Sequence, residues 1–174
     1  MGRSLARACM LTLLLLSTAC GYHTGGKAVR LPADLHTIYV PAFSNYSHTY
    51  RVAQTFTEAV VRELRSRTNY RIVTSNDGDV DAVLTGTITS VMTAPLTYDS
   101  VTGRISSSMV VVTLNASLIG KDKKVLWSNP NFLYREQYQE SRDAPSFFEE
   151  ETPATQRIAT SFAKTLVADI VEAY

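Results

Sequence analysis

The sequence predicts an α/β protein: a two-layer sandwich with two helices packed on one face of a mostly antiparallel or mixed sheet of four long strands plus a short one. Two long segments, 80–92 and 105–119, alternate apolar residues with Thr, Ser and Asn, which is typical of strands covered on one side only. Two other segments, one centred near residue 60 and one at the C-terminal end, repeat apolar residues at helical spacing. Both helices are expected to cover the apolar face of the sheet.

The elements of the first half follow in order. Residues 35–40 form a short β-rich run that Pro41 stops. Residues 50–67 predict a helix, and 70–73 a brief strand before a turn-rich stretch at 75–79. The apolar stripe of this helix consists of Val52, Phe56, Ala59, Val60 and Leu64.

The two long strands each have an apolar face and a polar face. The polar faces are uncharged and β-branched, which suits packing in an interface where hydroxyls form hydrogen bonds. An ordinary solvated sheet face is the alternative. The residues predicted to face a partner are Thr85, Thr87, Thr113 and Asn115.

The remaining segments complete the sheet and its cover. Residues 95–103 are expected to form a loop between the long strands, and 120–123 a turn. Residues 125–138 predict a final extended segment, broken or bulged near Asn129–Pro130–Asn131.

The C-terminal helix has the clearest start signal. Thr152 is a candidate N-cap, Pro153 fits the first helical position, and three glutamates at 149–151 favour the positive end of the helix dipole. Its apolar stripe consists of Ile158, Phe162, Leu166 and Ile170.

The first twenty residues predict export. Arg3 and Arg7 precede an apolar run over 8–16, and small residues lead to Cys20, which is the signal-peptide pattern. The run is about half the ~20 residues that a spanning helix needs. Small residues before a cysteine resemble a bacterial lipobox, which implies a covalent lipid on Cys20 and no other cofactor. Ser17 stands where that pattern prefers Leu, and an ordinary signal peptide with an incidental cysteine is the alternative.

The predicted organisation is therefore a signal peptide at 1–19, a lipidated tether at 20–34 and a single α/β domain at 35–174. Gly21 follows the cysteine where Asp would resemble an inner-membrane retention signal, which favours the outer membrane.

Composition and spacing give little support to catalysis. The chain has 17 basic and 16 acidic side chains, so there is no basic stripe for nucleic acid. Both cysteines are N-terminal, and the three histidines lack metal-ligand spacing. The acidic run 77–81 begins like a calcium loop, but Ala82 and Ile88 occupy positions that require Gly and Glu. Ser161 and Lys164 match S-x-x-K without the partner motifs that acylating enzymes need. We therefore do not expect an enzyme.

Basic residues gather at two turns of the predicted sheet. Successive turns of antiparallel strands lie at opposite ends, so a single patch does not follow from the sequence. Lysines at turns commonly serve solubility, and contact with an anionic lipid is the alternative. The residues are Arg104, Lys121, Lys123 and Lys124.

Four stretches together carry a family resemblance: Ala-Cys-Gly-Tyr at 19–22, Ile-Tyr-Val-Pro-Ala-Phe-Ser-Asn at 38–45, Asp-Ala-Val-Leu-Thr-Gly at 81–86 and Met-Val-Val-Val-Thr-Leu-Asn-Ala at 109–116. The chain resembles the LptE family of lipopolysaccharide (LPS) assembly lipoproteins over essentially its whole mature length. The resemblance implies a mixed sheet backed by two helices, and anchoring in the inner leaflet of the outer membrane on its periplasmic face. It also implies binding to the LptD β-barrel, which such a protein plugs and helps to assemble, and contact with LPS during its insertion. The four basic turn residues are the candidates for LPS contact.

A different class shares part of this pattern. The stretch 38–45 is also similar to the first strand of periplasmic domains in the CsgG, LpoB and TolB-N group. Such a protein would act as an activator or a secretion-pore component, with the same anchor and a different partner.

Overall fold

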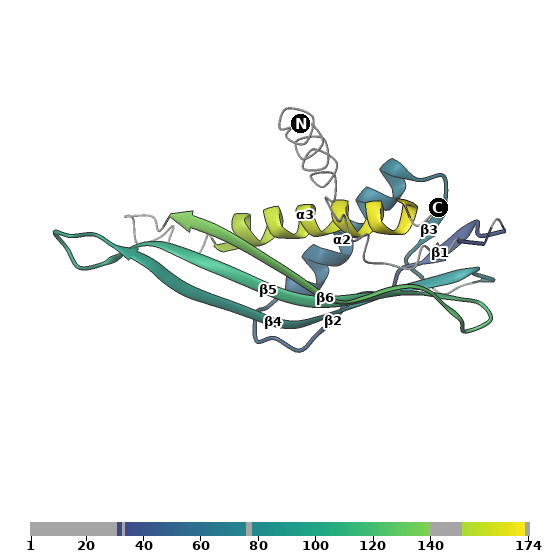
Figure 1. Ribbon diagram of the computed structural model, residues 1–174, viewed down its shortest axis with the longest axis horizontal. Coiled ribbons are helices and arrows are strands. Elements are labelled where there is room, and N and C mark those ends of the chain that lie inside the picture. Colours follow the sequence, from purple (N-terminus) through teal and green to yellow (C-terminus); the bar gives the residue numbers. More distant parts are fainter. Residues whose placement is uncertain (1–30, 33, 76–77, 140–150, 173–174) are drawn as a thin grey trace, which may run out of the picture.

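The computed structural model describes residues 31–32, 34–75, 78–139 and 151–172 (Figure 1). The predicted signal peptide, Cys20 and most of the predicted tether lie outside the described residues. The elements are β1 (Thr37–Tyr39), β2 (Ser44–Asn45), α2 (Val52–Arg67), β3 (Arg71–Val73), β4 (Ala82–Tyr98), β5 (Ile105–Gly120), β6 (Val125–Gln139) and α3 (Glu151–Glu172).

The described strands form one mixed sheet in the order β3-β1-β4-β5-β6, and β2 pairs with β4 beside β1. β1 runs parallel to both β3 and β4, whereas β4, β5 and β6 form an antiparallel meander. We call the end where β1 and β4 begin the base, and the β4–β5 turn the tip. Figure 1 shows the tip projecting well past the start of α3.

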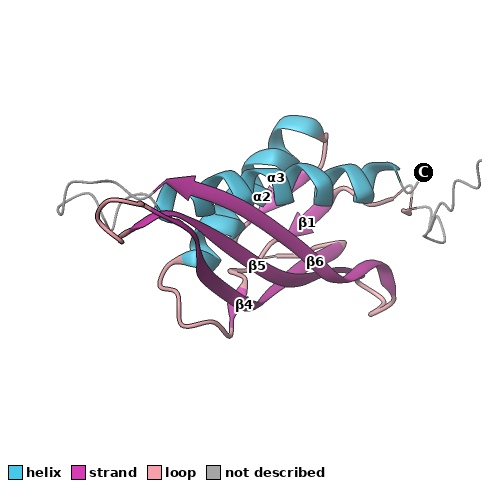
Figure 2. Ribbon diagram, turned by 60° about the vertical axis from the view of Figure 1, so that its left-hand side comes forward, coloured by secondary structure: helices cyan, strands magenta, loops and turns pink. Residues whose placement is uncertain are grey.

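Both helices lie on one face of the sheet, as predicted (Figures 1 and 2). The sheet therefore has an inner face under the helices and an outer face away from them. On the inner face the side chains of β4 and β5 alternate into the core, and Leu84, Ile88, Leu114 and Leu118 are fully buried there. The two-layer α/β sandwich is confirmed.

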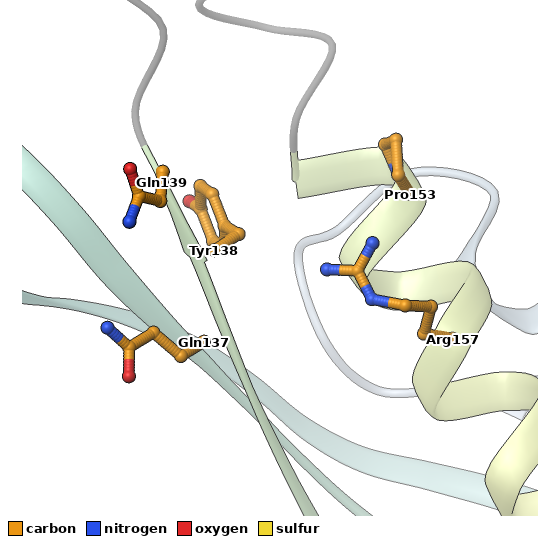
Figure 3. Close-up of a pocket in the computed structure, with 5 residues that line it drawn as sticks. All are labelled: Gln137, Tyr138, Gln139, Pro153 and Arg157. Carbon is orange, nitrogen blue, oxygen red and sulfur yellow. The ribbon is translucent and has the colours of Figure 1, made fainter.

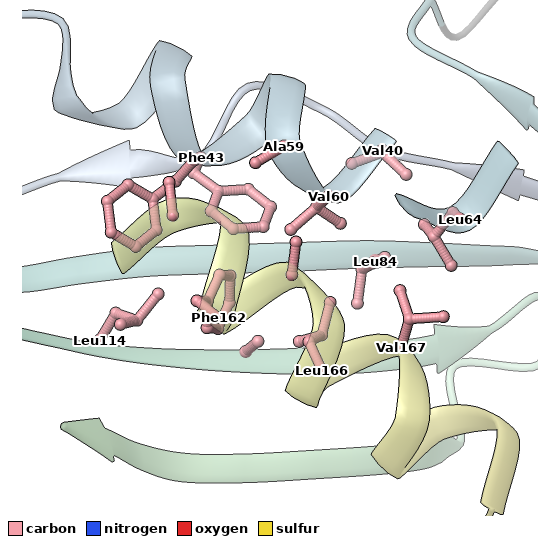
Figure 4. Packing of buried hydrophobic residues seen from close by; sticks show 14 of the residues in the cluster. Val40, Phe43, Ala59, Val60, Leu64, Leu84, Leu114, Phe162, Leu166 and Val167 are labelled. Carbon is pink, nitrogen blue, oxygen red and sulfur yellow. The ribbon is translucent and has the colours of Figure 1, made fainter. Parts of the chain in front are cut away.

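Phe162 of α3 lies at the centre of this core (Figure 4). Its ring is 5.1 Å from that of Phe132, 5.6 Å from Phe56 and 6.3 Å from Phe43, measured between centroids. Aromatic pairs at these distances add about 0.5–1.5 kcal/mol each beyond the area they bury. Phe162 of α3 therefore contacts α2, β6 and the connection between β1 and β2 through one side chain.

The helices match the prediction in their stripes and differ at their starts. The buried positions of α3 include Ile158, Phe162, Leu166 and Ile170, and those of α2 include all five predicted stripe residues. α3 begins at Glu151, so Thr152 is a helical residue and the predicted N-cap at Thr152 is wrong. The glutamates at 149 and 150 lie outside the described residues.

The lengths of the strands differ from those predicted, with three long and three short ones among the described elements instead of four long and one short. β1 is only three residues long, because Pro41 follows it closely and cannot donate to a ladder. β4 continues through Pro95 to Tyr98, so most of the predicted 95–103 loop is strand. Proline is tolerated there because, in the described part of the chain, no strand pairs with that edge of β4 beyond Ile88. The register shift opposite Leu114 and Ala116 confirms the predicted bulge near Asn129–Asn131.

Candidate interaction surface: the outer face of the sheet

The outer face carries very little charge. Neither β4 nor β5 contains a charged residue over its whole length. Arg135 of β6, which pairs with Val111 in register, is the charged side chain nearest the middle of this face. Charged residues are depleted in the cores of protein interfaces because desolvating them is costly. The outer face therefore has the composition of a surface that another molecule covers.

The four residues predicted to face a partner all lie on this face, close to the base. Thr87 and Asn115 are directly opposite each other on β4 and β5, and Thr85 is opposite Ser117. The Thr85 and Ser117 hydroxyls are 3.0 Å apart, within hydrogen-bonding distance. Thr113 lies one step nearer the tip, opposite Ser90. The structure brings these side chains into one polar field and leaves their role as partner contacts a prediction.

Toward the tip the outer face becomes apolar, a feature that the sequence pattern did not predict. The register of β4 shifts between Ile88 and Ser90, so that Met92 faces outward opposite Val111. The side chain of Met92 is 66% exposed, and Leu133, which is opposite Thr113 on β6, is 44% exposed. Met109 and Val111 are half-buried between them. Methionine and aliphatic side chains of this kind fit adaptable binding surfaces.

The β-bulge at Thr89 explains why the sequence pattern does not predict the apolar half of the outer face. Strict alternation from Thr85 and Thr87 places every odd-numbered residue of β4 on the outer face. The extra residue at Thr89 reverses that pattern, so that the even-numbered Met92 points outward instead. The Thr89 hydroxyl donates to the Thr113 carbonyl oxygen at 3.0 Å, which holds the irregular position in place. A run of β-branched residues gives no signal for such a shift.

The predicted basic residues do not form one patch. Arg104 lies at the tip, whereas the three lysines lie in the β5–β6 turn at the base, at the other end of β5. The 16 residues of β5 at about 3.3 Å each separate the two groups by about 50 Å. Contact of either group with LPS stays a prediction, and a single site made of both is excluded.

Lys121 and two aspartates at the base have partners of their own. Lys121 forms an ion pair with Asp79 at 2.6 Å, and the side-chain hydrogen bond to that carboxylate raises the pKa of Lys121. The carboxylate of Asp81 accepts from the backbone N–H groups of His36 at 2.9 Å and Thr37 at 2.7 Å. These two bonds, that of His36 foremost, hold the pKa of the Asp81 carboxyl below its ordinary value. The described part of the acidic run fastens β1 to β4.

A cleft of about 610 Å³ lies between the end of β6 and the first turns of α3 (Figure 3). Gln137, Tyr138, Gln139, Pro153 and Arg157 line it. The Arg157 Nε donates to the carboxylate of Glu136 at 2.6 Å, so this guanidinium is already paired. The amide, phenol and guanidinium groups of this lining offer hydrogen bonds and no nucleophile paired with a base.

Two properties of the described residues bear on the class of protein. No group of three or more His, Cys, Asp or Glu side chains is placed to hold a metal ion in the described part of the chain. None of the described helices is long and apolar enough to cross a membrane.

The fold defines an α/β domain with one sheet face covered by helices and the other presented outward. The LptE lipopolysaccharide-assembly family model matches residues 35–170. The chain belongs to this LptE family, whose members are lipoproteins of outer-membrane biogenesis and LPS assembly.

Solved structures of low sequence identity share the fold. Rare lipoprotein B from Shewanella oneidensis is 17% identical with a TM-score of 0.53, covering 76% of this chain and 94% of that one. A putative lipoprotein from Caulobacter crescentus CB15 is 10% identical with a TM-score of 0.52, covering 74% and 87%. The uncharacterized lipoprotein B from Nitrosomonas europaea is 13% identical with a TM-score of 0.50, covering 84% and 87%. No curated protein sequence matches the chain.

Proposed function

We propose that this protein is a lipid-anchored component of the outer-membrane LPS translocon. It binds an LptD-like β-barrel through the outer face of its sheet, plugs the barrel, and assists both barrel assembly and LPS insertion. The protein acts by binding and not by catalysis. The observation that carries the proposal is the uncharged outer face in a member of the LptE family.

The two halves of the outer face suit the inner wall of a barrel. Barrel interiors are lined mostly by polar side chains, and the hydroxyls around Thr87 and Asn115 can exchange hydrogen bonds with such a wall. The apolar side chains around Met92 and Leu133 gain from being removed from water, at about 25 cal/mol per Å² buried. A plug that buried charged strands would instead have to desolvate them.

Site-specific photo-crosslinking in the intact membrane tests the docking surface. A photoreactive residue at Thr87 or at Met92 is expected to capture the LptD-like barrel. The same residue at Lys164, which is exposed on α3 in the helix layer, is the matched control and should capture it much less. Equal capture from both faces would refute docking through the outer face. Capture of a cell-wall synthase or a secretion pore instead would favour the CsgG, LpoB and TolB-N type of function.

The anchor is tested separately. Acylation of Cys20 would hold the protein to the inner leaflet of the outer membrane on the periplasmic side, because several acyl chains on one residue give lasting attachment. Replacement of Cys20 by Ala is expected to move the protein from the membrane fraction to the soluble fraction in cells that lack the barrel. Unchanged partitioning would refute lipidation.

LPS contact requires two separate experiments, since the basic residues lie at opposite ends of β5. Arg104→Glu tests the tip, and the double change of Lys123 and Lys124 to Glu tests the base. Reduced LPS pull-down with only one of these variants would assign the contact to that end. Undiminished pull-down with both would remove all three residues from consideration.

A further inference from the structure

The loop between β2 and α2 projects onto the same side of the molecule as the outer face. In Figures 1 and 2 it drops below the sheet, away from the helices, although it leads into a helix of the opposite layer. We call residues 46–51 the ledge. Because β2 pairs with β4 at Thr87 and Ile88, the ledge borders the outer face at the edge of β4.

The ledge is held in a defined shape by its own hydrogen bonds. The Asn45 side chain accepts from the backbone N–H of Ser47 at 2.9 Å and donates to the Thr49 carbonyl at 3.0 Å. The backbone N–H of Tyr46 donates to the Ile88 carbonyl of β4 at 2.9 Å. The ledge is thus preorganised, and a partner would lose little conformational entropy in ordering it.

Large side chains point away from this fixed backbone. Tyr46 is 77% exposed and Tyr50 is 82% exposed. The Arg51 guanidinium carbon lies 5.2 Å from the centre of the Tyr50 ring, a cation–π arrangement. Tyrosine and arginine are the residues that most often carry binding energy in protein interfaces.

Arg51 is poorly suited to its backbone position. Its φ of 60° and ψ of −1° lie in the left-handed region, where glycine and asparagine are the comfortable residues. It is also the N-cap of α2, and its side chain makes no capping hydrogen bond. Glycine or asparagine at this position would tolerate the left-handed backbone and would be a better N-cap. Strained residues of this kind concentrate at functional sites, which makes the Arg51 side chain a candidate for binding.

The charge of the ledge favours an anionic group as its partner. No acidic residue occurs between Asp34 and Glu58, whereas this stretch contains His48 and Arg51. Within the described part of the chain Arg51 forms no ion pair, and β4 beside it is uncharged. A guanidinium on an uncharged border is complementary to a carboxylate on the partner.

We propose that the ledge receives a carboxylate-bearing segment of the same barrel. Arg51 pairs with an Asp or Glu side chain of that segment, and Tyr46 and Tyr50 pack on either side of it. This inference rests on the proposed function and adds a second, charge-dependent contact to the outer face.

The test measures the affinity of the full-length lipoprotein for the purified LptD-like barrel in detergent, together with the melting temperature of each variant. Arg51→Gly removes the side chain and suits the left-handed backbone, so it is expected to fold at least as stably and to bind at least tenfold more weakly. Arg51→Glu should bind more weakly still. Arg62→Glu, the same charge reversal at an exposed position of α2, is the matched control and should bind as the wild type does. The wild-type affinity should also fall more steeply with salt than that of Arg51→Gly.

The outcomes separate this inference from the proposed function. If the wild type itself fails to bind the barrel, the proposed function is refuted and the ledge contact with it. If the wild type binds and both Arg51 variants bind equally well, the ledge contact alone is refuted. If the Arg51 variants lose LPS binding while keeping full affinity for the barrel, the anion is a lipid phosphate and the proposal is overturned.

Discussion

Replacing Gly86 by Ala tests how the core positions the base of the sheet. Gly86 lies on the inner face of β4, opposite Ala116, and a Cβ added there would meet three atoms of the Phe43 ring at 2.4–2.6 Å. Real Cβ contacts essentially never fall below 3.0 Å, so the ring must move. It has little room, because Phe43 is buried and packs edge-on against Phe162.

The expected cost can be worked from these contacts. Overpacking a tight core costs about 1–3 kcal/mol, while removing a glycine from a strand returns about 0.5–1 kcal/mol. The added Cβ would lie well inside contact distance, so the upper part of the overpacking range, about 2–3 kcal/mol, applies. The net loss for Gly86→Ala is then about 1–2.5 kcal/mol, which for a domain of this size lowers the melting temperature by about 3–8 °C. Thermal unfolding followed by circular dichroism measures this change directly.

Two controls make the result interpretable. A Cβ added at Gly78, which lies in a turn, would have nothing within 4 Å of it, so Gly78→Ala should change the melting temperature very little. Phe43→Leu removes the obstructing ring atoms, so the double variant should be less destabilised than the sum of the two single changes. A melting temperature for Gly86→Ala equal to that of the wild type, or strict additivity in the double variant, would refute the steric argument.

Three further predictions concern the base, the ledge and the core. The pKa of the Asp81 carboxyl is lowered by its bonds to the backbone N–H groups of His36 and Thr37, so the stability of the wild type should fall as the pH drops below 3.8 and through the folded-state pKa. Asp81→Asn removes this carboxylate, and urea titrations of the variant should lack this part of the pH dependence. Arg51→Gly should raise the free energy of unfolding by about 1 kcal/mol by relieving the left-handed backbone, and a decrease measured by the same titration would contradict the strain argument. Phe162→Ala should lower it by about 3–5 kcal/mol, and a loss below about 1 kcal/mol would show that the aromatic rings packed around Phe162 are not central to the core.

Much of the fold could be predicted because its signals are periodic. The i, i+4 stripe from Ile158 to Ile170 and the alternation along β5 each repeat over many residues, so a single exception does not hide them. The short strands were harder, because β1 and β3 are formed by parallel pairing with neighbours distant in sequence. The end of β4 is not predicted correctly for a related reason. Proline normally ends a strand, and Pro95 is tolerated because no described strand pairs with that edge of β4.

The interaction surface could be predicted only in part. The polar half around Thr87 follows from simple alternation, whereas the apolar half around Met92 depends on one extra residue at Thr89 that reverses the faces. Arg51 gave no signal as a site residue, because its left-handed backbone and its missing cap bond are properties of the folded loop. Strand register and backbone strain depend on tertiary contacts, so the local sequence gives little information about them.

Two of the stretches that carry the family resemblance, 38–45 and 81–86, hold the base together. Ile38 of the stretch 38–45 pairs with Ala82 of the stretch 81–86, and Phe43 packs on Gly86 between the same two stretches. Asp81 adds two bonds to the backbone beside β1. These two stretches therefore pack against each other. Their similarity to relatives is evidence for a shared fold more than for a shared partner.

It follows that partner contact is best tested at residues that do not join β1 to β4. Met92 and Arg51 lie outside both stretches, and neither is needed to join β1 to β4. Changes at Gly86 or Asp81 would lower binding indirectly, through the amount of folded protein. Changes at Met92 or Arg51 that weaken barrel binding at an unchanged or higher melting temperature would instead identify the surface that the partner contacts. If barrel affinity tracked melting temperature across all four positions, binding would depend on the fold alone, and neither Met92 nor Arg51 would be a partner contact.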